Sequence, residues 1–152
     1  MVDNLRIVRV IADYQLGFGA GKVLFPNTCE FLLSKNGKIR QILDNGIRIA
    51  TLKADSGLLT LSIEGARRLH KFFPFPKLRV VVANDVADFI AMGRSVFAKH
   101  VVEVDRKIRA NDEVLVVNEK DELLATGKAI LSAYEMLELK KGVAVKIRQG
   151  VK

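Results

Sequence analysis

The last apolar run of the sequence carries two cations at a spacing that could bind an anion. Between residues 143 and 148 aliphatic residues alternate with Ala144, Lys146 and Arg148. In an extended strand this period of two turns both cations to one outer face, with the small Ala144 beside them. Such a strip could neutralise phosphate, although an ordinary solvated strand face has the same pattern.

A second basic run follows a glycine that is predicted to end a short helix. Arg94 and Lys99 follow Gly93 in the sequence. A phosphate or ribose can approach the backbone closely at a glycine, and arginine offers a planar, two-pronged donor. The alternatives are that Gly93 only caps the helix and that both cations are solvated. Phe97, between them, is expected to face the core.

Other residues that could do chemistry do not form a recognisable catalytic or metal site. The glycine-rich run 17–21 lacks both the preceding strand and the spacing of a phosphate-binding loop, and is predicted to be a turn between helices. His70 and His100 have no companions at metal-ligand spacing. Asp13 is expected to accept hydrogen bonds from backbone N–H groups, and Cys29 to be a buried, inert thiol. We therefore expect no metal, no cofactor and no enzyme.

The charge of the chain favours a polyanionic partner. The 152 residues carry a net charge of +8. Residues 1–77 hold 12 Lys and Arg against 6 Asp and Glu, whereas residues 78–152 hold 13 against 11. Nucleic acid, anionic lipid and tuning of solubility all remain open on this ground. Arg67, Arg68 and Lys71 on a predicted helix could extend an RNA path or form a solvated face.

The first half of the sequence predicts helices around an antiparallel meander. Apolar residues recur at helical spacing in residues 3–16, and Asp3 or Asn4 can cap that helix. Short apolar strands separated by Asn36-Gly37 and Asn45-Gly46 predict hairpins, because both residue types accept a positive φ. The remaining predicted elements of this half are a short helical piece that ends at Phe25, before Pro26, a strand at 58–61 and a helix at 62–73.

Two prolines close the first half and a small barrel is predicted after them. Phe73-Pro74-Phe75-Pro76 cannot continue a helix, which predicts domains at 1–76 and 77–152. After this break come a strand at 78–82, a helix ending near Met92, strands near 95–104, 113–118, 122–131 and 143–149, and a helical turn at 133–139. The fold class is α+β, with a mixed β-barrel at the C-terminal end. A single cysteine, no bilayer-spanning run and no signal peptide predict a cytoplasmic protein.

The motifs of the second half resemble those of a known RNA-binding module. They are, in order, Met92-Gly93-Arg94-Ser95-Val96-Phe97-Ala98-Lys99, Ile108-Arg109-Ala110-Asn111-Asp112-Glu113-Val114, Leu123-Leu124-Ala125-Thr126-Gly127-Lys128-Ala129 and Gly142-Val143-Ala144-Val145-Lys146-Ile147-Arg148. This set is similar to the PUA domain of pseudouridine synthases and archaeosine transglycosylases. The resemblance implies an RNA-facing surface made of the helix-to-strand corner and the last strand, namely Gly93, Arg94, Ser95, Lys99, Ala144, Lys146 and Arg148.

The first half resembles the domain that precedes the PUA domain in archaeal tRNA-guanine (archaeosine) transglycosylases. The matching residues are Ile11-Ala12-Asp13-Tyr14-Gln15-Leu16-Gly17-Phe18-Gly19-Ala20-Gly21 and Leu24-Phe25-Pro26. The chain has no room for the base-exchanging barrel of ~250 residues. The resemblance therefore implies a non-catalytic protein that binds tRNA or similar structured RNA, as an accessory to tRNA modification. The alternatives are a subunit of a tRNA-modifying enzyme complex and a protein–protein adaptor in translation.

Overall fold

The computed structural model describes residues 3–152 and divides into two compact units. The first unit ends at Phe72 and the second begins at Phe73. The domain division between residues 76 and 77 stays a prediction. In residues 3–152 no helix has the length and apolar character needed to cross a bilayer.

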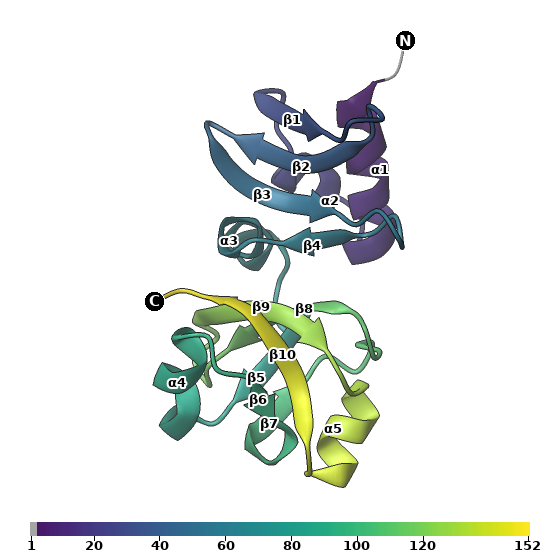
Figure 1. Cartoon of the computed structure of the whole chain (residues 1–152). Helices are drawn as coiled ribbons and strands as arrows, with labels where there is room; N and C mark the ends of the chain where they lie inside the picture. The colour runs from purple at the N-terminus through teal and green to yellow at the C-terminus, as the bar shows by residue number, and fades with distance from the viewer. Residues whose placement is uncertain (1–2) are drawn as a thin grey trace. The chain divides into compact units, whose positions relative to one another are not determined.

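The first unit places three helices beside one antiparallel sheet. Its sheet has the strand order β1-β2-β3-β4, as the sequence meander predicts (Figure 1). The elements are α1 (Asn4–Leu16), α2 (Ala20–Leu24), β1 (Cys29–Leu33), β2 (Ile39–Asp44), β3 (Ile47–Leu52), β4 (Leu59–Leu61) and α3 (Ile63–Phe72).

Local sequence explains how the elements of this unit begin and turn. The Asp3 side chain accepts a hydrogen bond from the Arg6 N–H at 3.1 Å, which caps α1. Asn45 and Gly46 both have positive φ, 51° and 80°, as a two-residue hairpin requires. At the other predicted hairpin only Gly37 has a positive φ, so a longer loop connects β1 to β2.

The glycine-rich run between α1 and α2 is a turn, as predicted. Asp13 Oδ1 accepts a hydrogen bond from the Gly21 N–H at 2.7 Å, so this carboxylate holds the start of α2. A Cβ on Gly21 would overlap the backbone of Arg9, which shows that the run allows α2 to approach α1 closely. The predicted structural role of Asp13 is confirmed.

The second unit is a nearly closed mixed β-barrel with small helices at its ends. Its six strands lie in the order β6-β10-β9-β8-β5-β7, and only β5 and β8 pair in parallel. The elements are β5 (Arg79–Val82), η1 (Asn84–Val86), α4 (Ala87–Ala91), β6 (Val96–Phe97), η2 (Ala98–His100), β7 (Val101–Val104), β8 (Glu113–Val117), β9 (Leu123–Ala129), α5 (Ala133–Leu139) and β10 (Val143–Gly150). The predicted α+β class is confirmed.

One predicted strand of the barrel is divided in two. The sequence favoured a continuous strand near 95–104, but the 3₁₀ turn η2 separates β6 from β7. Ala98 in this turn is fully buried, and β6 and β7 are the two edges of the sheet. The chain must therefore bend at η2 to pass from one edge of the barrel to the other.

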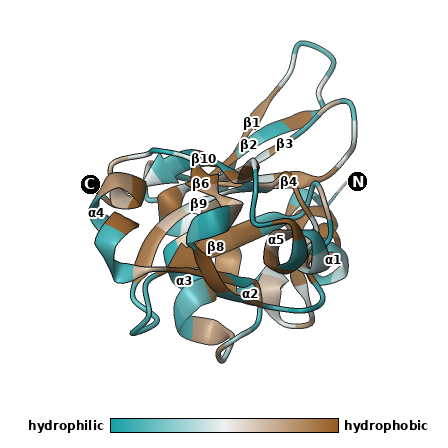
Figure 2. Ribbon diagram, turned by 90° about the horizontal axis from the view of Figure 1, so that it is seen from below, coloured by the Kyte–Doolittle hydropathy of each residue, from teal (hydrophilic) through white to brown (hydrophobic). Residues whose placement is uncertain are grey.

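The barrel core consists of small and branched aliphatic side chains. Val80, Val114, Val116 and Val145 are completely buried within it, and Met136 of α5 joins the same cluster. Figure 2 shows the hydrophobic colour concentrated on the barrel strands, β8 among them. A core of this kind supplies a rigid base for the polar residues on the outer side of β10.

Candidate nucleic-acid interface

The corner between α4 and β6 is closed by backbone hydrogen bonds. The Gly93 N–H donates to the Ile90 carbonyl at 2.9 Å and the Arg94 N–H donates to the Phe89 carbonyl at 3.1 Å. This is the Schellman arrangement, with Gly93 at a φ of 105° as the left-handed cap. Gly93 is thus a helix cap, and both N–H groups at the corner are already used. The space around its Cα is nevertheless open.

The end of the chain fixes this corner to the barrel. The Lys152 N–H donates to the Ala91 carbonyl at 3.0 Å. A Cβ on Gly150 would overlap that same carbonyl, so a glycine is needed where β10 passes α4. The position of Arg94 relative to β10 is therefore set by tight backbone contacts.

The β6–β10 ladder brings the two basic runs of the sequence together. Val96 pairs with Val145, and Phe97 pairs with Val143, in antiparallel register. Extending this register by one residue places Ser95 beside Lys146 on the neighbouring strand, with Arg94 next to it. Neighbouring strands lie about 4.8 Å apart, so the backbone segments that carry the two basic runs are adjacent here.

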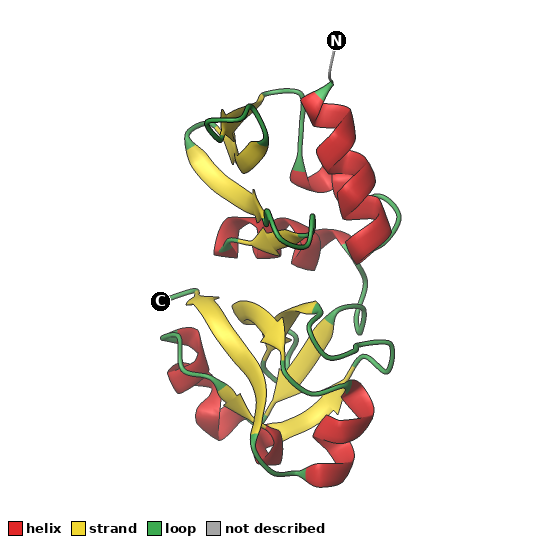
Figure 3. Cartoon of the chain, turned by 45° about the vertical axis from the view of Figure 1, so that its right-hand side comes forward, coloured by secondary structure: helices red, strands yellow, loops and turns green. Residues whose placement is uncertain are grey.

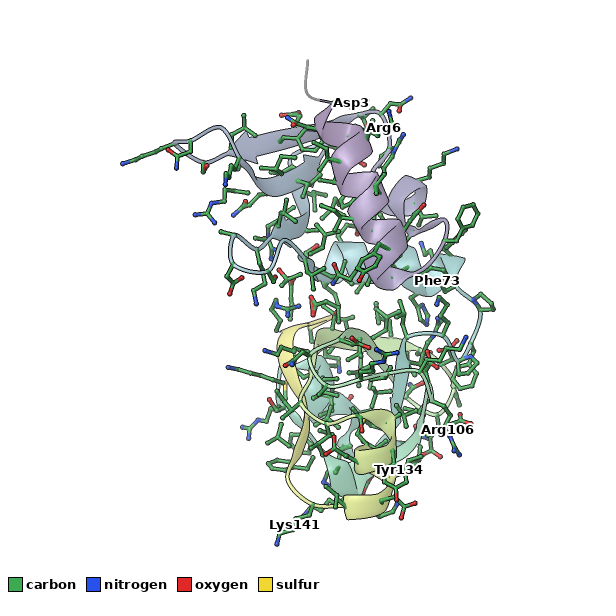
Figure 4. The ribbon with its side chains drawn as sticks, turned by 90° about the vertical axis from the view of Figure 1, so that its right-hand side faces the viewer. Asp3, Arg6, Phe73, Arg106, Tyr134 and Lys141 are labelled. Atoms are coloured by element: carbon green, nitrogen blue, oxygen red, sulfur yellow. The ribbon has the colours of Figure 1, made fainter. Side chains whose placement is uncertain are left out.

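Lys99 lies next to a second basic turn that the sequence analysis did not include. The Ala98 N–H donates to the Gly142 carbonyl at 2.8 Å, which joins η2 to the start of β10. Lys140 and Lys141 immediately precede Gly142, and Lys141 projects away from the barrel (Figure 4). The β6–β10 pairing and this hydrogen bond bring the lysine pair to the segment of Lys99, although the adjacent lysines are visible in the sequence.

Arg148 is engaged in a bidentate ion pair. Its guanidinium donates to the two carboxylate oxygens of Glu113 at 2.7 and 2.9 Å, and the Glu113 side chain is only 4% exposed. A buried carboxylate needs such a partner because water cannot solvate it. The positive charge of Arg148 is therefore balanced within the barrel, whereas no ion pair within residues 3–152 includes Lys146.

Two sequence predictions about side-chain direction are wrong. Ala144 was expected on the outer face beside Lys146, but it is completely buried and belongs to the core cluster. Its carbonyl accepts hydrogen bonds from Ile130 and Leu131, which pulls this part of β10 inward. Phe97 was expected to face the core, but it is 47% exposed because β6 is a short edge strand.

The predicted basic helix of the first unit is largely paired. Arg68 binds Asp44 at 2.9 Å and Glu64 at 3.1 Å, and it also donates to the Leu24 carbonyl. Arg67 contacts the same Glu64 at 3.4 Å. Hydrogen bonding from Thr28 holds the pKa of Asp44 below its ordinary value, with Arg68 acting in the same direction against the effect of burial.

Cys29 differs from the buried thiol that the sequence suggested. It is only partly buried, yet burial and the nearby Asp44 carboxylate raise its pKa to about 11. The thiol is therefore protonated at neutral pH and is a weak nucleophile. Within residues 3–152 no three His, Cys, Asp or Glu residues are grouped closely enough to hold a metal ion.

Comparisons with known proteins cover nearly the whole chain. The family described as the patch-forming domain C2 of tRNA-guanine transglycosylase matches residues 6–76, and the PUA domain family matches residues 78–151. A tRNA-guanine(15) transglycosylase of Methanothermobacter thermautotrophicus is 52% identical over 150 residues, which are 98% of this chain and 23% of that protein. The Pyrococcus furiosus transglycosylase is 51% identical over 144 residues, 95% of this chain and 24% of the relative.

Solved structures share the fold at lower identity. A hypothetical protein from Pyrococcus horikoshii superimposes with a TM-score of 0.75 and 24% identity, covering 97% of this chain and 90% of that one. A conserved PUA domain protein from Thermoplasma acidophilum gives 0.64 and 22%, covering 95% and 86%. The chain spans about a quarter of the length of the curated transglycosylases it matches. It is therefore a PUA-domain protein whose two domains belong to the C2 and PUA families and resemble the C-terminal region of the archaeal tRNA-guanine(15) transglycosylases.

Proposed function

We propose that this protein binds structured RNA, with tRNA as the expected partner, and that it does not itself catalyse a reaction. The binding surface would comprise the α4–β6 corner, η2 and the outer side of β10. We expect the protein to act in the cytoplasm, as its single cysteine suggests. The match to transglycosylases that act on tRNA supports the choice of RNA, and the PUA match supports the choice of surface.

The observation that carries the proposal is a group of cations that form no ion pair with an acidic residue in the described part of the chain. The ion pairs found within residues 3–152 include none of this group's side chains. The group consists of Arg94, Lys99, Lys140, Lys141 and Lys146, contributed by three neighbouring segments. An unpaired surface cation releases bound counterions from a phosphate when it contacts RNA, which favours binding.

The residues of this surface suit an RNA stem with an unpaired end. Ser95 can donate its hydroxyl to a phosphate or to a 2′-OH, and the open side of Gly93 leaves space for the sugar–phosphate backbone. Phe97 is about half exposed beside these cations. An unpaired base could stack on its ring, which is a common way for proteins to hold single-stranded RNA. Arg148 would act by fixing β10, since its charge is balanced by Glu113.

A binding titration with matched variants tests this proposal. Fluorescently labelled tRNA is titrated with the wild-type chain, with the triple variant Arg94→Ala, Lys99→Ala, Lys146→Ala, and with Arg106→Ala. We expect the triple variant to bind about 10- to 100-fold more weakly. Arg106 is an exposed cation that follows β7, a strand that pairs with neither β6 nor β10, so its removal should have little effect. Equal losses for both variants would indicate unspecific attraction and would contradict the proposed surface.

A base-exchange assay distinguishes a non-catalytic accessory role of the chain from a role in catalysis. Incorporation of labelled guanine into tRNA is measured with this chain alone, with a transglycosylase alone and with both together. We expect no exchange by this chain alone, because its match spans only about a quarter of each transglycosylase relative. Exchange that requires both proteins would identify the chain as a subunit of a tRNA-modifying complex.

A further inference from the structure

Helix α1 uses only one side to hold the first unit together. Val8, Ala12 and Leu16 recur every four residues and are buried. Gln15 anchors the end of the helix to β4, accepting from the Leu59 N–H at 2.7 Å and donating to the Leu59 carbonyl at 2.8 Å. These contacts account for the inner side of α1 and leave the opposite side outside the core.

The opposite side of α1 is also apolar. Ile7, Val10 and Tyr14 follow one another at spacings of three and four residues, and they are 39%, 60% and 85% exposed. Phe18, in the turn that follows, is 91% exposed. Figure 3 shows α1 on the outside of its unit. A surface helix normally carries polar residues opposite its buried side, so this second apolar stripe indicates an interface.

The chemistry of the α1 stripe (Ile7, Val10, Tyr14 and Phe18) favours a polypeptide. The stripe carries no charged side chain that could neutralise a phosphate, whereas tyrosine and phenylalanine are enriched in protein interfaces. Two exposed aromatic side chains can each bury roughly 150–250 Å². With the two aliphatic residues they would supply about half of the ~800 Å² that one partner contributes to a typical stable interface.

We propose that the α1 stripe docks onto a polypeptide that carries the remaining three quarters of a tRNA-guanine(15) transglycosylase. In the curated relatives, a region about 50% identical to nearly all of this chain forms 23–24% of the protein. In those relatives the two domains are therefore joined to a further stretch of polypeptide that is about three times as long as they are. This inference rests on the family match and deepens the proposed function by assigning a partner and a surface for it.

Photocrosslinking identifies the molecule that contacts the α1 stripe. Tyr14 is replaced by the photoreactive residue p-benzoylphenylalanine in the organism that makes this protein, and crosslinked peptides are identified by mass spectrometry. Tyr134 on α5, which is 73% exposed, receives the same replacement as the matched control. We expect crosslinks from position 14, and none from position 134, to a polypeptide that aligns with the transglycosylase portion absent from this chain. Crosslinks only to a second copy, to RNA, to unrelated proteins or to nothing would overturn the proposal.

Charged substitutions in the α1 stripe test whether this surface binds the partner polypeptide independently of RNA binding. The double variant Val10→Glu, Tyr14→Glu should lower the amount of the transglycosylase polypeptide that co-purifies with the chain at least 10-fold, with Tyr134→Glu as control. Its affinity for tRNA and its melting temperature should match those of the wild type, because both residues lie outside the core. Unchanged co-purification would refute the docking surface. Failure of the wild type to bind tRNA would instead refute only the proposed function.

Discussion

Arg148 on β10 and Glu113 on β8 form a two-pronged ion pair that passes over the intervening strand β9, with N–O distances of 2.7 and 2.9 Å. Arg148→Ala would leave the buried Glu113 carboxylate without this partner. We expect the free energy of unfolding to fall by about 3 kcal/mol, measured by urea denaturation. The neighbouring Lys146→Ala should change stability by less than about 0.5 kcal/mol, because Lys146 is exposed and forms no ion pair within residues 3–152. Similar losses for both variants would show that the pair does not stabilise the barrel.

The salt dependence of RNA binding should reveal how many cations of the protein contact phosphate groups. About four phosphate contacts predict that the logarithm of the association constant falls with the logarithm of salt concentration at a slope near −3 to −4. In the triple variant of Arg94, Lys99 and Lys146 the slope should become shallower by about 2 to 3. Titrations at several KCl concentrations measure both slopes. A wild-type slope near zero would mean that phosphate neutralisation does not drive binding.

Two glycines of the barrel should respond differently to alanine. A Cβ on Gly127 would overlap the Lys146 carbonyl on β10, so Gly127→Ala must separate β9 from β10. Gly93 has open space around it and only its φ of 105° disfavours a side chain, at a cost of about 1–2 kcal/mol. Thermal unfolding should therefore show a much larger loss of Tm for Gly127→Ala. The reverse order would contradict the close approach of β9 and β10.

Asp44 should make the first unit sensitive to acid. Hydrogen bonding from Thr28 and the Arg68 pair hold its pKa below the ordinary value of 3.8. Because the folded-state pKa is depressed, the charged carboxylate stabilises the fold above the ordinary value, and this stabilisation is lost as pH falls through the folded-state pKa. Asp44→Asn should cost about 1–3 kcal/mol at pH 7, and a smaller difference from wild type should remain at pH 2–3. Denaturation at both pH values measures this, with the exposed Asp55→Asn as control.

Cys29 should be slow to alkylate despite its partial exposure. Its pKa of about 11, against an ordinary 9.0, lowers the thiolate fraction at pH 8 about 100-fold. Iodoacetamide should therefore react with the folded protein about 100-fold more slowly than with a cysteine peptide. Asp44→Asn should accelerate the reaction, because this carboxylate contributes to the raised pKa. Alkylation of the wild type at the peptide rate would exclude the raised pKa.

Local patterns in the sequence were sufficient for the family and for most elements, although not for the division of the strand predicted near 95–104. The capping aspartate at residue 3 and the Asn45-Gly46 turn act over a few residues, so their structural meaning can be read directly. The ordered motifs of both halves identified the C2 and PUA domains, and the comparisons confirm that resemblance.

The composition of the candidate surface depended on contacts between distant residues. Sequence spacing placed Ala144 outward and Phe97 inward. In the structure Ala144, whose carbonyl accepts two backbone hydrogen bonds, is buried, and Phe97, on the edge strand β6, is exposed. Nothing local to Arg148 indicates that Glu113, 35 residues away, balances its charge. The sequence by itself determined which cations the chain carries and which domains it forms. Only the tertiary structure decided which of those cations are paired and which side chains face solvent, because both depend on strand pairing across the barrel.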